Sequence, residues 1–407
     1  MPVKILMLLL AMIYDALAVF LLLPFILLSR WQAKAGRYAG DRSSVSMLLR
    51  KLVNDGRETV IFYCSSVGEY EQAVPVIAMH EAHGYRAVVF FHSRAGLEHC
   101  SRMSDHEAYM TPYDMTMIWT LLLLQMRPVA FIINRHEFWP GAVTAAAWLS
   151  KLYVINYVEH EGMSLIDRCV LAMSRKVFCV NIPHRHMTKL FMAGDTRIDR
   201  LRQRHDANRQ AIAAMRYVLY EHMPLGKRLV VIGNAYAADV AQLAKARPEL
   251  YDAYRFLIVP ARKGIGDVRM QGVLHIDEVS AIDWKEVRVA VLHTMGDLFE
   301  VYGCADVAWV GGGFAQGVHN CLEPAFYGIP VICGPLLDEQ PEALAFLKDG
   351  RLNTFESDAE LSLLLSELMA KDTKSRPETT PYSPTAYIFN QLYENHYPRK
   401  ELVDARA

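Results

Sequence analysis

The sequence predicts an α/β protein of two doubly wound domains in series, preceded by an apolar helix associated with a membrane. Three observations indicate this architecture. The chain has 407 residues, 52% of them hydrophobic, which suits two domains of about 150–200 residues better than one. From residue 41 onward, short runs rich in Val, Ile, Phe and Tyr alternate with helical stretches. The stretch that precedes them, 5–29, is almost wholly apolar.

The N-terminal stretch is long enough to cross a hydrocarbon core, which takes roughly 20 helical residues. Four basic residues follow it: Arg30, Lys34, Arg37 and Arg42. Such residues place the rest of a chain on the cytoplasmic side of the membrane. Asp15, in the middle of the stretch, is costly for a span and leaves open a helix that lies in one leaflet. We therefore expect residues 1–30 to anchor the protein, with the depth of insertion undecided.

The first domain is expected over residues 41–205. Its apolar runs are typical of strands buried on both faces of a parallel sheet, with helical crossovers between them. The expected strands are 59–65, 87–92, 129–135, 152–158 and 176–182. Between 200 and 227 the pattern becomes polar and helical, and we place the domain boundary there.

The second domain, 226–372, repeats this design. The expected strands are 228–235, 256–260, 272–276, 287–292, 307–310 and 330–333, with helices at 237–245, 297–303 and 322–327. Two Rossmann-like halves of this kind would face a cleft with the carboxyl ends of their strands. In the tail, 373–407, the segment 383–397 has helical periodicity, with Ser383 as its cap, and could pack back on the first domain.

Composition excludes several classes of function. The net charge is -1, whereas nucleic-acid-binding proteins usually carry a basic excess, so no nucleic-acid partner is expected. The seven cysteines form no CxxC pair, and His184-x-His186 and Glu159-His160-Glu161 lack helical ligand spacing. We expect no metal site and no cofactor. No GxSxG elbow is present, which disfavours a serine nucleophile.

The most informative stretch is 308–335, AWVGGGFAQGVHNCLEPAFYGIPVICGP. An apolar strand runs into Gly311, Gly312 and Gly313, which would let the backbone approach a ligand closely. His319 and Asn320 then precede a helix with Glu323 in its first turn, where free amides suit a phosphate and the carboxylate suits ribose hydroxyls. The alternative is a glycine-rich turn with Asn320 as a helix cap; we favour nucleotide binding.

A second candidate lies at the end of the first strand, in CSSVGEYEQA, where Glu69 would project from a strand-to-helix turn. Sugar transfer with inversion needs a base that takes the proton of a hydroxyl, and a partly buried glutamate suits this role. However, Ser66 and Glu69 also have the spacing of a capping box. Spacing alone does not decide between the two.

Three further turns carry candidate residues. RHEFWP closes a strand with His136, Glu137 and Trp139, which either line a cleft or pack the start of a helix. PARKG places Arg262 and Lys263 where they would meet a phosphate, or form an exposed basic turn. HTMGDL places Met295 and Gly296 near a nucleotide base, or simply caps a helix with Thr294 or Asp297.

At these residues the sequence resembles the Kdo (3-deoxy-D-manno-octulosonic acid) transferase family of lipopolysaccharide biosynthesis, over nearly the whole chain. The matching segments are LLPFILLSR, SSVGE, EFWP, GDTRID, TMGDL and GVHNCLEPAFYGIPVICGP. The resemblance implies a GT-B fold, with the first domain for the acceptor and the second for the nucleotide sugar. It implies that Glu69 is the catalytic base, that Glu137 is catalytic, and that Gly68 lies in the substrate site.

The function implied is transfer of Kdo from a CMP-activated donor to a lipid A precursor at the inner membrane. Several positions depart from the family pattern. Arg135 and His136 precede EFWP, no arginine follows Asn156-Tyr157, Tyr236 stands where a histidine is usual, and RHPER is reduced to ARKG. An altered donor or acceptor, a non-catalytic protein that binds a sugar nucleotide, and a GT-B transferase that uses a UDP-sugar therefore remain open.

Overall fold

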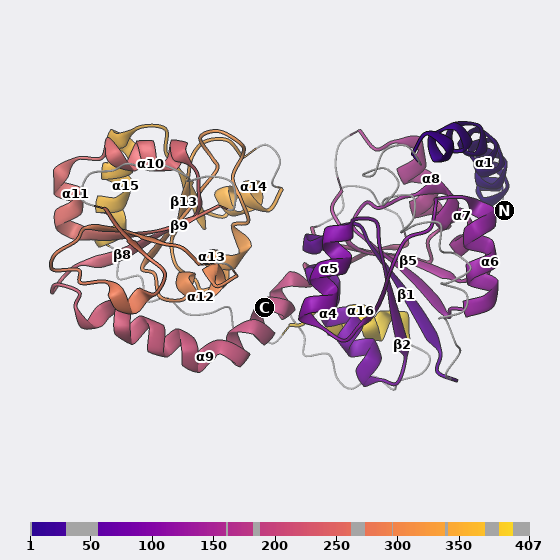
Figure 1. The fold of residues 1–407 in the computed structure, drawn as a ribbon, viewed down its shortest axis with the longest axis horizontal. Helices are drawn as coiled ribbons and strands as arrows, with labels where there is room; N and C mark the ends of the chain where they lie inside the picture. Colours follow the sequence, from indigo (N-terminus) through magenta and orange to yellow (C-terminus); the bar gives the residue numbers. More distant parts are fainter. Residues whose placement is uncertain are drawn as a thin grey trace. The chain divides into compact units, whose positions relative to one another are not determined.

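The computed structural model describes residues 2–29, 56–159, 162–181, 188–261, 273–294, 296–337, 341–370 and 382–393. The chain divides into two compact units, each with its own sheet (Figure 1). Unit 1 comprises Met1–Arg200 and Tyr382–Ala407, and unit 2 comprises Leu201–Pro381. Helix α9 (Arg197–Glu221) contains the boundary between them.

Unit 1 is built on a parallel sheet of seven strands in the order β3-β2-β1-β4-β5-β6-β7. The strands are β1 (Thr59–Cys64), β2 (Arg86–Phe91), β3 (Glu107–Met110), β4 (Ala130–Asn134), β5 (Lys151–Tyr157), β6 (Lys176–Cys179) and β7 (Leu190–Met192). The five strands expected from continuous apolar runs are confirmed. The edge strands β3 and β7 were not predicted, because they are short, mostly half-buried and therefore carry little apolar pattern.

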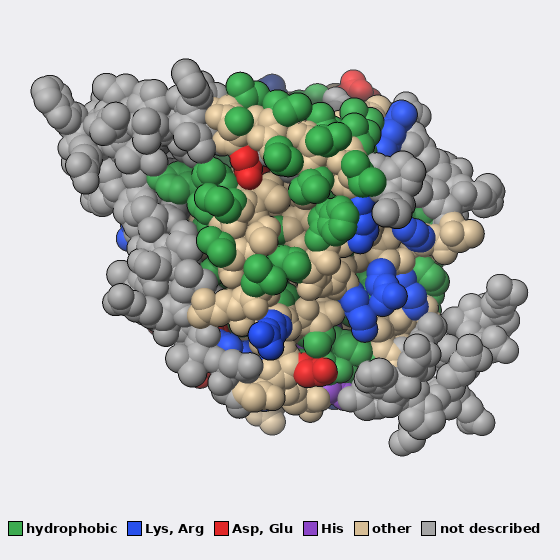
Figure 2. Space-filling view, turned by 90° about the vertical axis from the view of Figure 1, so that its right-hand side faces the viewer, with side chains coloured by type: hydrophobic (Ala, Val, Ile, Leu, Met, Phe, Trp, Pro, Cys, Tyr) green, Lys and Arg blue, Asp and Glu red, His purple; other side chains and the backbone are tan. Residues whose placement is uncertain are grey.

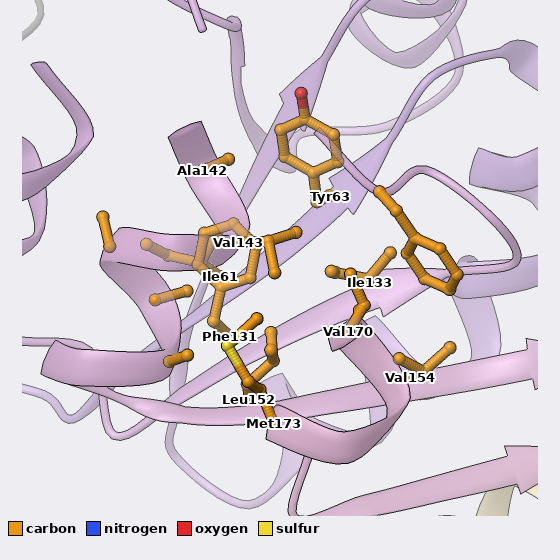
Figure 3. Close-up of a cluster of buried hydrophobic side chains, with 14 of the residues drawn as sticks. Ile61, Tyr63, Phe131, Ile133, Ala142, Val143, Leu152, Val154, Val170 and Met173 are labelled. Atoms are coloured by element: carbon orange, nitrogen blue, oxygen red, sulfur yellow. The ribbon is translucent and has the colours of Figure 1, made fainter. Parts of the chain in front are cut away.

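Helices cover both faces of this sheet. They are α4 (Val67–Ala82), α5 (Arg94–Met103), α6 (Thr116–Met126), α7 (Pro140–Leu149), α8 (Leu165–Met173) and α16 (Pro384–Leu392). On one face, buried residues of α6, α7 and α8 form a core with the strands, and Figure 3 shows Val143 and Val170 over Ile61, Phe131 and Ile133. On the other face, α4, α5 and α16 contribute to a second apolar core. Ser383 caps α16 as expected, by accepting a hydrogen bond from the amide of Ala386.

The N-terminal helix α1 (Pro2–Ser29) packs against the α6–α7–α8 face of unit 1. Met7 is buried in that core. Asp15 accepts hydrogen bonds from the Thr116 amide (2.9 Å) and hydroxyl (3.3 Å), at the start of α6. Among the described residues, no helix is both long enough and apolar enough to cross a membrane. The basic residues at 30–42 lie outside the described residues.

Unit 2 is built on a second parallel sheet, in the order β10-β11-β9-β8-β12-β13-β14. The strands are β8 (Arg228–Ala235), β9 (Tyr254–Pro260), β10 (Val273–Ile276), β11 (Val289–Leu292), β12 (Val307–Val310), β13 (Val331–Cys333) and β14 (Leu352–Thr354). The helices are α10 (Ala237–Ala244), α11 (Pro248–Ala253), α12 (Leu298–Tyr302), α13 (Leu322–Phe326), α14 (Pro341–Lys348) and α15 (Asp358–Ala370), with a 3-10 turn, η1 (Val279–Ala281). The six expected strands are confirmed, and β14, a short edge strand, was not predicted.

The strand order gives each sheet a switch point, where successive strands begin to be added in the opposite direction. In unit 1 this point lies between β1 and β4, and in unit 2 between β8 and β12. Ligands of open α/β sheets bind at such points, outside the carboxyl ends of the strands. The loops after these four strands carry most of the residues that the sequence singled out.

Candidate functional site

Glu69 lies in the first turn of α4, directly after β1 at the switch point of unit 1. Its Oε2 atom accepts hydrogen bonds from the Ser65 amide (2.6 Å) and the Ser65 hydroxyl (2.8 Å). Within the described part of the chain, no protein group donates to Oε1. Ser65 thus holds one of the two carboxylate oxygens in place.

The capping-box alternative is only half realised. The Ser66 hydroxyl accepts a hydrogen bond from the Glu69 amide, as a helix cap does. The carboxylate of Glu69, however, bonds to Ser65 instead of returning to the amide of the cap residue itself. Ser66 alone therefore caps α4, and the carboxylate contributes nothing to a reciprocal box.

The surroundings of Glu69 favour its protonated form. Burial raises the pKa of the carboxyl, and the negative charge of Glu137 raises it further. The two hydrogen bonds from Ser65 and the positive charge of Arg135 act in the opposite direction and only partly offset this. A carboxylate with a raised pKa is a stronger base than an exposed glutamate, as general-base catalysis requires.

Glu137 follows β4, on the other side of the same switch point. Its Oε2 atom accepts a hydrogen bond from the Trp139 indole (2.8 Å), and the Trp139 ring stacks on His92 at 4.2 Å between centroids. Trp139 also stands at the N-cap of α7, with Pro140 in the first turn. The helix-start interpretation of RHEFWP is confirmed, because Trp139 begins α7, and its indole also orients Glu137. The cleft-lining interpretation stays a prediction.

In unit 2 the three glycines directly follow β12 and are fully packed. A Cβ atom on Gly311 would overlap the carbonyl oxygen of Asn234, and one on Gly313 would lie 2.7 Å from the Gly334 nitrogen. Gly312 has a φ of 95°, a backbone conformation that residues with a side chain rarely adopt. Close packing of backbone on backbone thus requires these glycines, whether or not a ligand also approaches them.

Asn320 and Glu323 lie together at the start of α13. The Asn320 side chain accepts a hydrogen bond from the Leu322 amide (3.0 Å), and its Nδ2 donates to Glu323 Oε1 (3.2 Å). Cys321 stands at the N-cap position and makes no side-chain cap bond, but the Asn320 side chain bonds the first amide of the helix, so one of the amides expected to be free for a phosphate is already bonded. Glu323 is half-buried in the first turn of α13. Burial raises the pKa of Tyr302, and the negative charge of Glu323 raises it further.

Two residues outside the predicted set complete this cluster. The Tyr236 hydroxyl lies 2.9 Å from His319 Nε2, and the two rings are nearly parallel. Burial lowers the pKa of His319, so its ring is neutral at pH 7. Buried Asp239 accepts hydrogen bonds from the Gly312 amide (3.0 Å) and the Tyr236 amide (2.8 Å). Asp239 thus joins the glycine turn after β12 to the helix after β8.

Of the remaining predicted residues, Gly68 is exposed beside Glu69, and Gly296 is exposed with a φ of 98°. The carbonyl oxygen of Gly296 accepts a hydrogen bond from Arg204. Arg262, Lys263 and Met295 lie outside the described residues. The structure therefore groups Gly68, Glu69 and Glu137 in unit 1, and the Gly311–Gly313 turn, His319, Asn320 and Glu323 in unit 2.

Comparisons with known proteins show what the chain is similar to. Residues 29–156 match the family described as 3-deoxy-D-manno-octulosonic-acid transferase (kdotransferase). The 3-deoxy-D-manno-octulosonic acid transferase of Aquifex aeolicus (strain VF5) is 23% identical over 319 residues, covering 76% of this chain and 85% of the relative. The transferase of the same name from Chlamydophila psittaci (strain ATCC VR-125 / 6BC) is 23% identical over 308 residues, covering 69% and 70%.

The chain is similar to the Kdo transferase family as a diverged relative. It is a glycosyltransferase. Similar solved structures include UDP-GlcNAc 2-epimerase from Neisseria meningitidis (TM-score 0.57, 15% identity, covering 83% of this chain and 100% of that one). MurG from Acinetobacter baumannii gives a TM-score of 0.54 at 12% identity, covering 83% and 99%. These likenesses show that the transferase has a GT-B fold.

Sequence reasoning missed Ser65, Asn134 and Asp239 in this glycosyltransferase, and it noted Asn156 and Tyr236 only as departures from the family pattern. Asn134 Nδ2 donates to the backbone oxygen of Glu69 (2.5 Å). One signal was present in the sequence: both asparagines are polar residues at the carboxyl end of an otherwise apolar strand run. Polar side chains in that position must find buried partners, which makes them candidates for positioning roles.

Proposed function

We propose that this glycosyltransferase moves Kdo, or a related acidic sugar, from a CMP-activated donor to a lipid A precursor or a similar lipid-linked acceptor. Transfer inverts the anomeric centre and uses no metal ion. The observation that carries the proposal is the Glu69 carboxylate, with one oxygen held by Ser65 and its pKa raised by burial. The choice of Kdo as the sugar is based on the names of the similar proteins.

In the proposed reaction, Oε1 of Glu69 takes the proton of an acceptor hydroxyl as that oxygen attacks the anomeric carbon of the donor sugar. The bond between this carbon and the phosphate oxygen breaks, and CMP leaves with the electron pair. Glu137, held by the Trp139 indole, keeps negative charge beside the base and so raises its pKa. Proton transfer of this kind contributes about 10²–10⁴-fold to a rate.

We assign nucleotide binding to unit 2. The Glu323 carboxylate would accept hydrogen bonds from the ribose hydroxyls, the Asn320 amide group would donate to the nucleotide, and the Gly311–Gly313 turn would lie against it next to His319. The neutral His319 ring, hydrogen-bonded to Tyr236, offers a polar surface without a positive charge. Arg262 and Lys263, outside the described residues, are proposed to meet the phosphate, and Met295 with Gly296 the base.

The test is a transfer assay with CMP-Kdo and lipid A precursor in detergent micelles, with the anomeric configuration of the product read by NMR. Glu69→Gln should lower turnover by at least about 100-fold, because the amide cannot accept the proton. Glu98→Gln is the matched control, since Glu98 is an exposed residue of α5 that pairs with Arg94. If Glu69→Gln turns over at close to the wild-type rate, the assignment of Glu69 as the catalytic base is refuted.

Two further outcomes would overturn other parts of the proposal. Tight binding of CMP-Kdo by calorimetry, without transfer by the wild-type protein, would show a non-catalytic sugar-nucleotide-binding protein. Stronger competition by UDP than by CMP would show that the donor is a UDP-sugar. Both alternatives were left open by the sequence, and both are decided by the same purified protein.

We also propose that the transferase attaches to the cytoplasmic face of the inner membrane through one face of unit 1. Exposed apolar side chains gather over α1, α6, α7 and α8, and Lys and Arg side chains border them (Figure 2). These residues are Val3, Ile5, Leu6, Leu9, Leu10, Met12, Ile13, Leu17, Met117, Leu121, Leu124, Trp148, Leu165 and Ile166. Contiguous apolar surface of this extent on a folded protein is a mark of a membrane or protein contact.

Asp15 supports attachment with α1 lying along the membrane surface. Its carboxylate bonds to the first turn of α6, so moving α1 into the bilayer would break these bonds and bury a charge. Vesicle flotation with anionic lipid tests this surface: wild type should float, and the Met12→Ser/Ile13→Ser/Leu17→Ser variant should not. Leu225→Ser, which removes an exposed leucine from unit 2, is the control and should float normally. Equal flotation of both variants would contradict the proposal.

A further inference from the structure

A buried polar network lies at the carboxyl edge of the first sheet, beneath the turn that carries Glu69. Asn134 ends β4, Asn156 is near the end of β5, and Thr196 immediately precedes α9. Their exposed fractions are 1%, 0% and 0%. Buried polar groups are stable only when hydrogen-bonded, and a fully bonded network specifies one arrangement of the chain around it.

The hydrogen bonds of this network form a continuous path. Asn156 Nδ2 donates to Asn134 Oδ1 (2.9 Å) and to the Thr196 hydroxyl (2.8 Å). The Thr196 amide donates in return to Asn156 Oδ1 (3.0 Å). Asn156 has a φ of 54°, in the left-handed region that asparagine tolerates better than most residues. The backbone of β5 thus adopts an unusual conformation where its side chain joins β4 to the start of α9.

Both ends of the network bond to backbone carbonyls in the first two turns of α4. Asn134 Nδ2 donates to the carbonyl oxygen of Glu69 (2.5 Å), and the Thr196 hydroxyl donates to the carbonyl oxygen of Gln72 (2.5 Å). These carbonyls belong to residues three apart in one helical turn. The network therefore restrains the turn at two points, and Ser66 restrains it at a third through its cap.

This restraint matters because the two bonds between Ser65 and Oε2 of Glu69 depend on where the turn lies. Ser65 precedes the helix, at the end of β1, whereas Glu69 is inside it. A shift of the turn away from β1 would lengthen both bonds, which measure 2.6 and 2.8 Å. Hydrogen bonds fall off within a few tenths of an ångström of their normal length, so a small shift removes them.

We propose that Asn134, Asn156 and Thr196 are positioning residues that hold the Glu69 carboxylate in its reactive orientation. They touch no reacting atom, and act through the backbone of the turn. The inference rests on the proposed role of Glu69 as the base. It predicts that loss of a network bond lowers kcat, leaves KM for the donor nearly unchanged, and moves the acidic limb of the pH–rate profile.

Thr196→Val is the sharpest variant, because valine keeps the shape of threonine and loses only the hydroxyl. We expect kcat to fall about 10-fold or more, with KM for CMP-Kdo within about 2-fold of wild type, since a misplaced base affects the chemical step. The acidic limb of kcat should move to higher pH, because the carboxylate loses hydrogen bonds that stabilise its ionised form. Thr196→Ser should restore both values.

Ser174→Ala provides the matched control. Ser174 is also fully buried, and its hydroxyl donates to the Val170 carbonyl (2.8 Å), but it lies at the amino-terminal end of β6, away from Glu69. Its loss should lower the melting temperature and leave the pH profile unchanged. The proposal is overturned if Thr196→Val behaves like Ser174→Ala, or if Thr196→Ser fails to restore activity.

Asn134→Ala, measured in the same way, decides the matter if Thr196→Val does not fold. It removes the bond to the Glu69 carbonyl itself and should show the same fall in kcat and the same shift of the acidic limb. A wild-type profile in a folded Asn134→Ala protein would overturn the proposal. Glu69→Gln separates the two levels of inference: if it remains active, the base assignment fails, and if it is inactive while the network variants are normal, only the positioning role fails.

Discussion

Helix α6 lacks a cap of its own, and the N-terminal helix supplies one. Met115 occupies the N-cap position and forms no side-chain cap bond. In its place Asp15 accepts hydrogen bonds from the amides of Thr116 (2.9 Å) and Met117 (3.4 Å), and from the Thr116 hydroxyl (3.3 Å). Asp15→Ala should therefore destabilise α6, although Asp15 and Thr116 are about a hundred positions apart in the chain.

The size of the effect follows from two contributions. Loss of an N-cap side chain costs about 1 kcal/mol. Loss of a negative charge at a helix N-terminus costs about 0.3–1 kcal/mol more. The total, about 1–2 kcal/mol, lowers the melting temperature of a unit of roughly 200 residues by about 3–6 °C. Asp15→Asn keeps the accepting oxygen and loses only the charge, so it should show the smaller part of this shift.

Two measurements on the protein in detergent check this. Thermal unfolding gives the melting temperature, and hydrogen–deuterium exchange reports the amides of Thr116 and Met117, which should exchange faster in Asp15→Ala. Met12→Ala is the control, because Met12 is an exposed residue of the same helix. If Asp15→Ala and Met12→Ala have the same melting temperature and the same exchange at these amides, α1 does not cap α6 and the reasoning is wrong.

Three other predictions concern the two sites and the thiols. Turnover needs Glu69 ionised, so activity is present above the pKa of Glu69 and is lost as the pH falls through that pKa. Hydrogen bonds from Ser65 lower this pKa and the charge of Glu137 raises it. Ser65→Ala should therefore move the acidic limb of the pH–rate profile to higher pH, and Glu137→Gln should move it to lower pH. Gly313→Ala places a Cβ atom 2.7 Å from the Gly334 nitrogen, and should abolish CMP binding by calorimetry or prevent folding of unit 2. All seven cysteines are buried, so a thiol reagent such as DTNB should label none of them in the folded protein and all of them in guanidinium chloride.

Much of the fold was predictable because buried parallel strands have a strong local signature. A run such as 59–65 or 228–235 is apolar at consecutive positions, which a strand covered on both faces requires. The edge strands β3 and β7 lack this signature because one side of each is open, so only their pairing with β2 and β6 reveals them.

The candidate residues were predictable to the extent that they stand directly after such strands. Glu69, Glu137 and the Gly311–Gly313 turn each follow a predicted strand, and within each unit parallel strands bring such loops to one edge of the sheet. The supporting groups could not be placed in this way. Asn134 and Asn156 are separated by 22 positions in the sequence, and their hydrogen bond exists only because β4 and β5 are neighbours in register.

The sequence by itself determined the alternation of strands and helices and the family resemblance carried by SVGE and HNxxEP. These are local patterns, recorded in consecutive residues. Only the tertiary structure decided how the ambiguous residues are used: Glu69 bonds to Ser65 instead of completing a capping box, and Asp15, unexpected in an apolar helix, caps α6. A hydrogen bond between distant residues depends on distances across the fold, which neither periodicity nor spacing encodes.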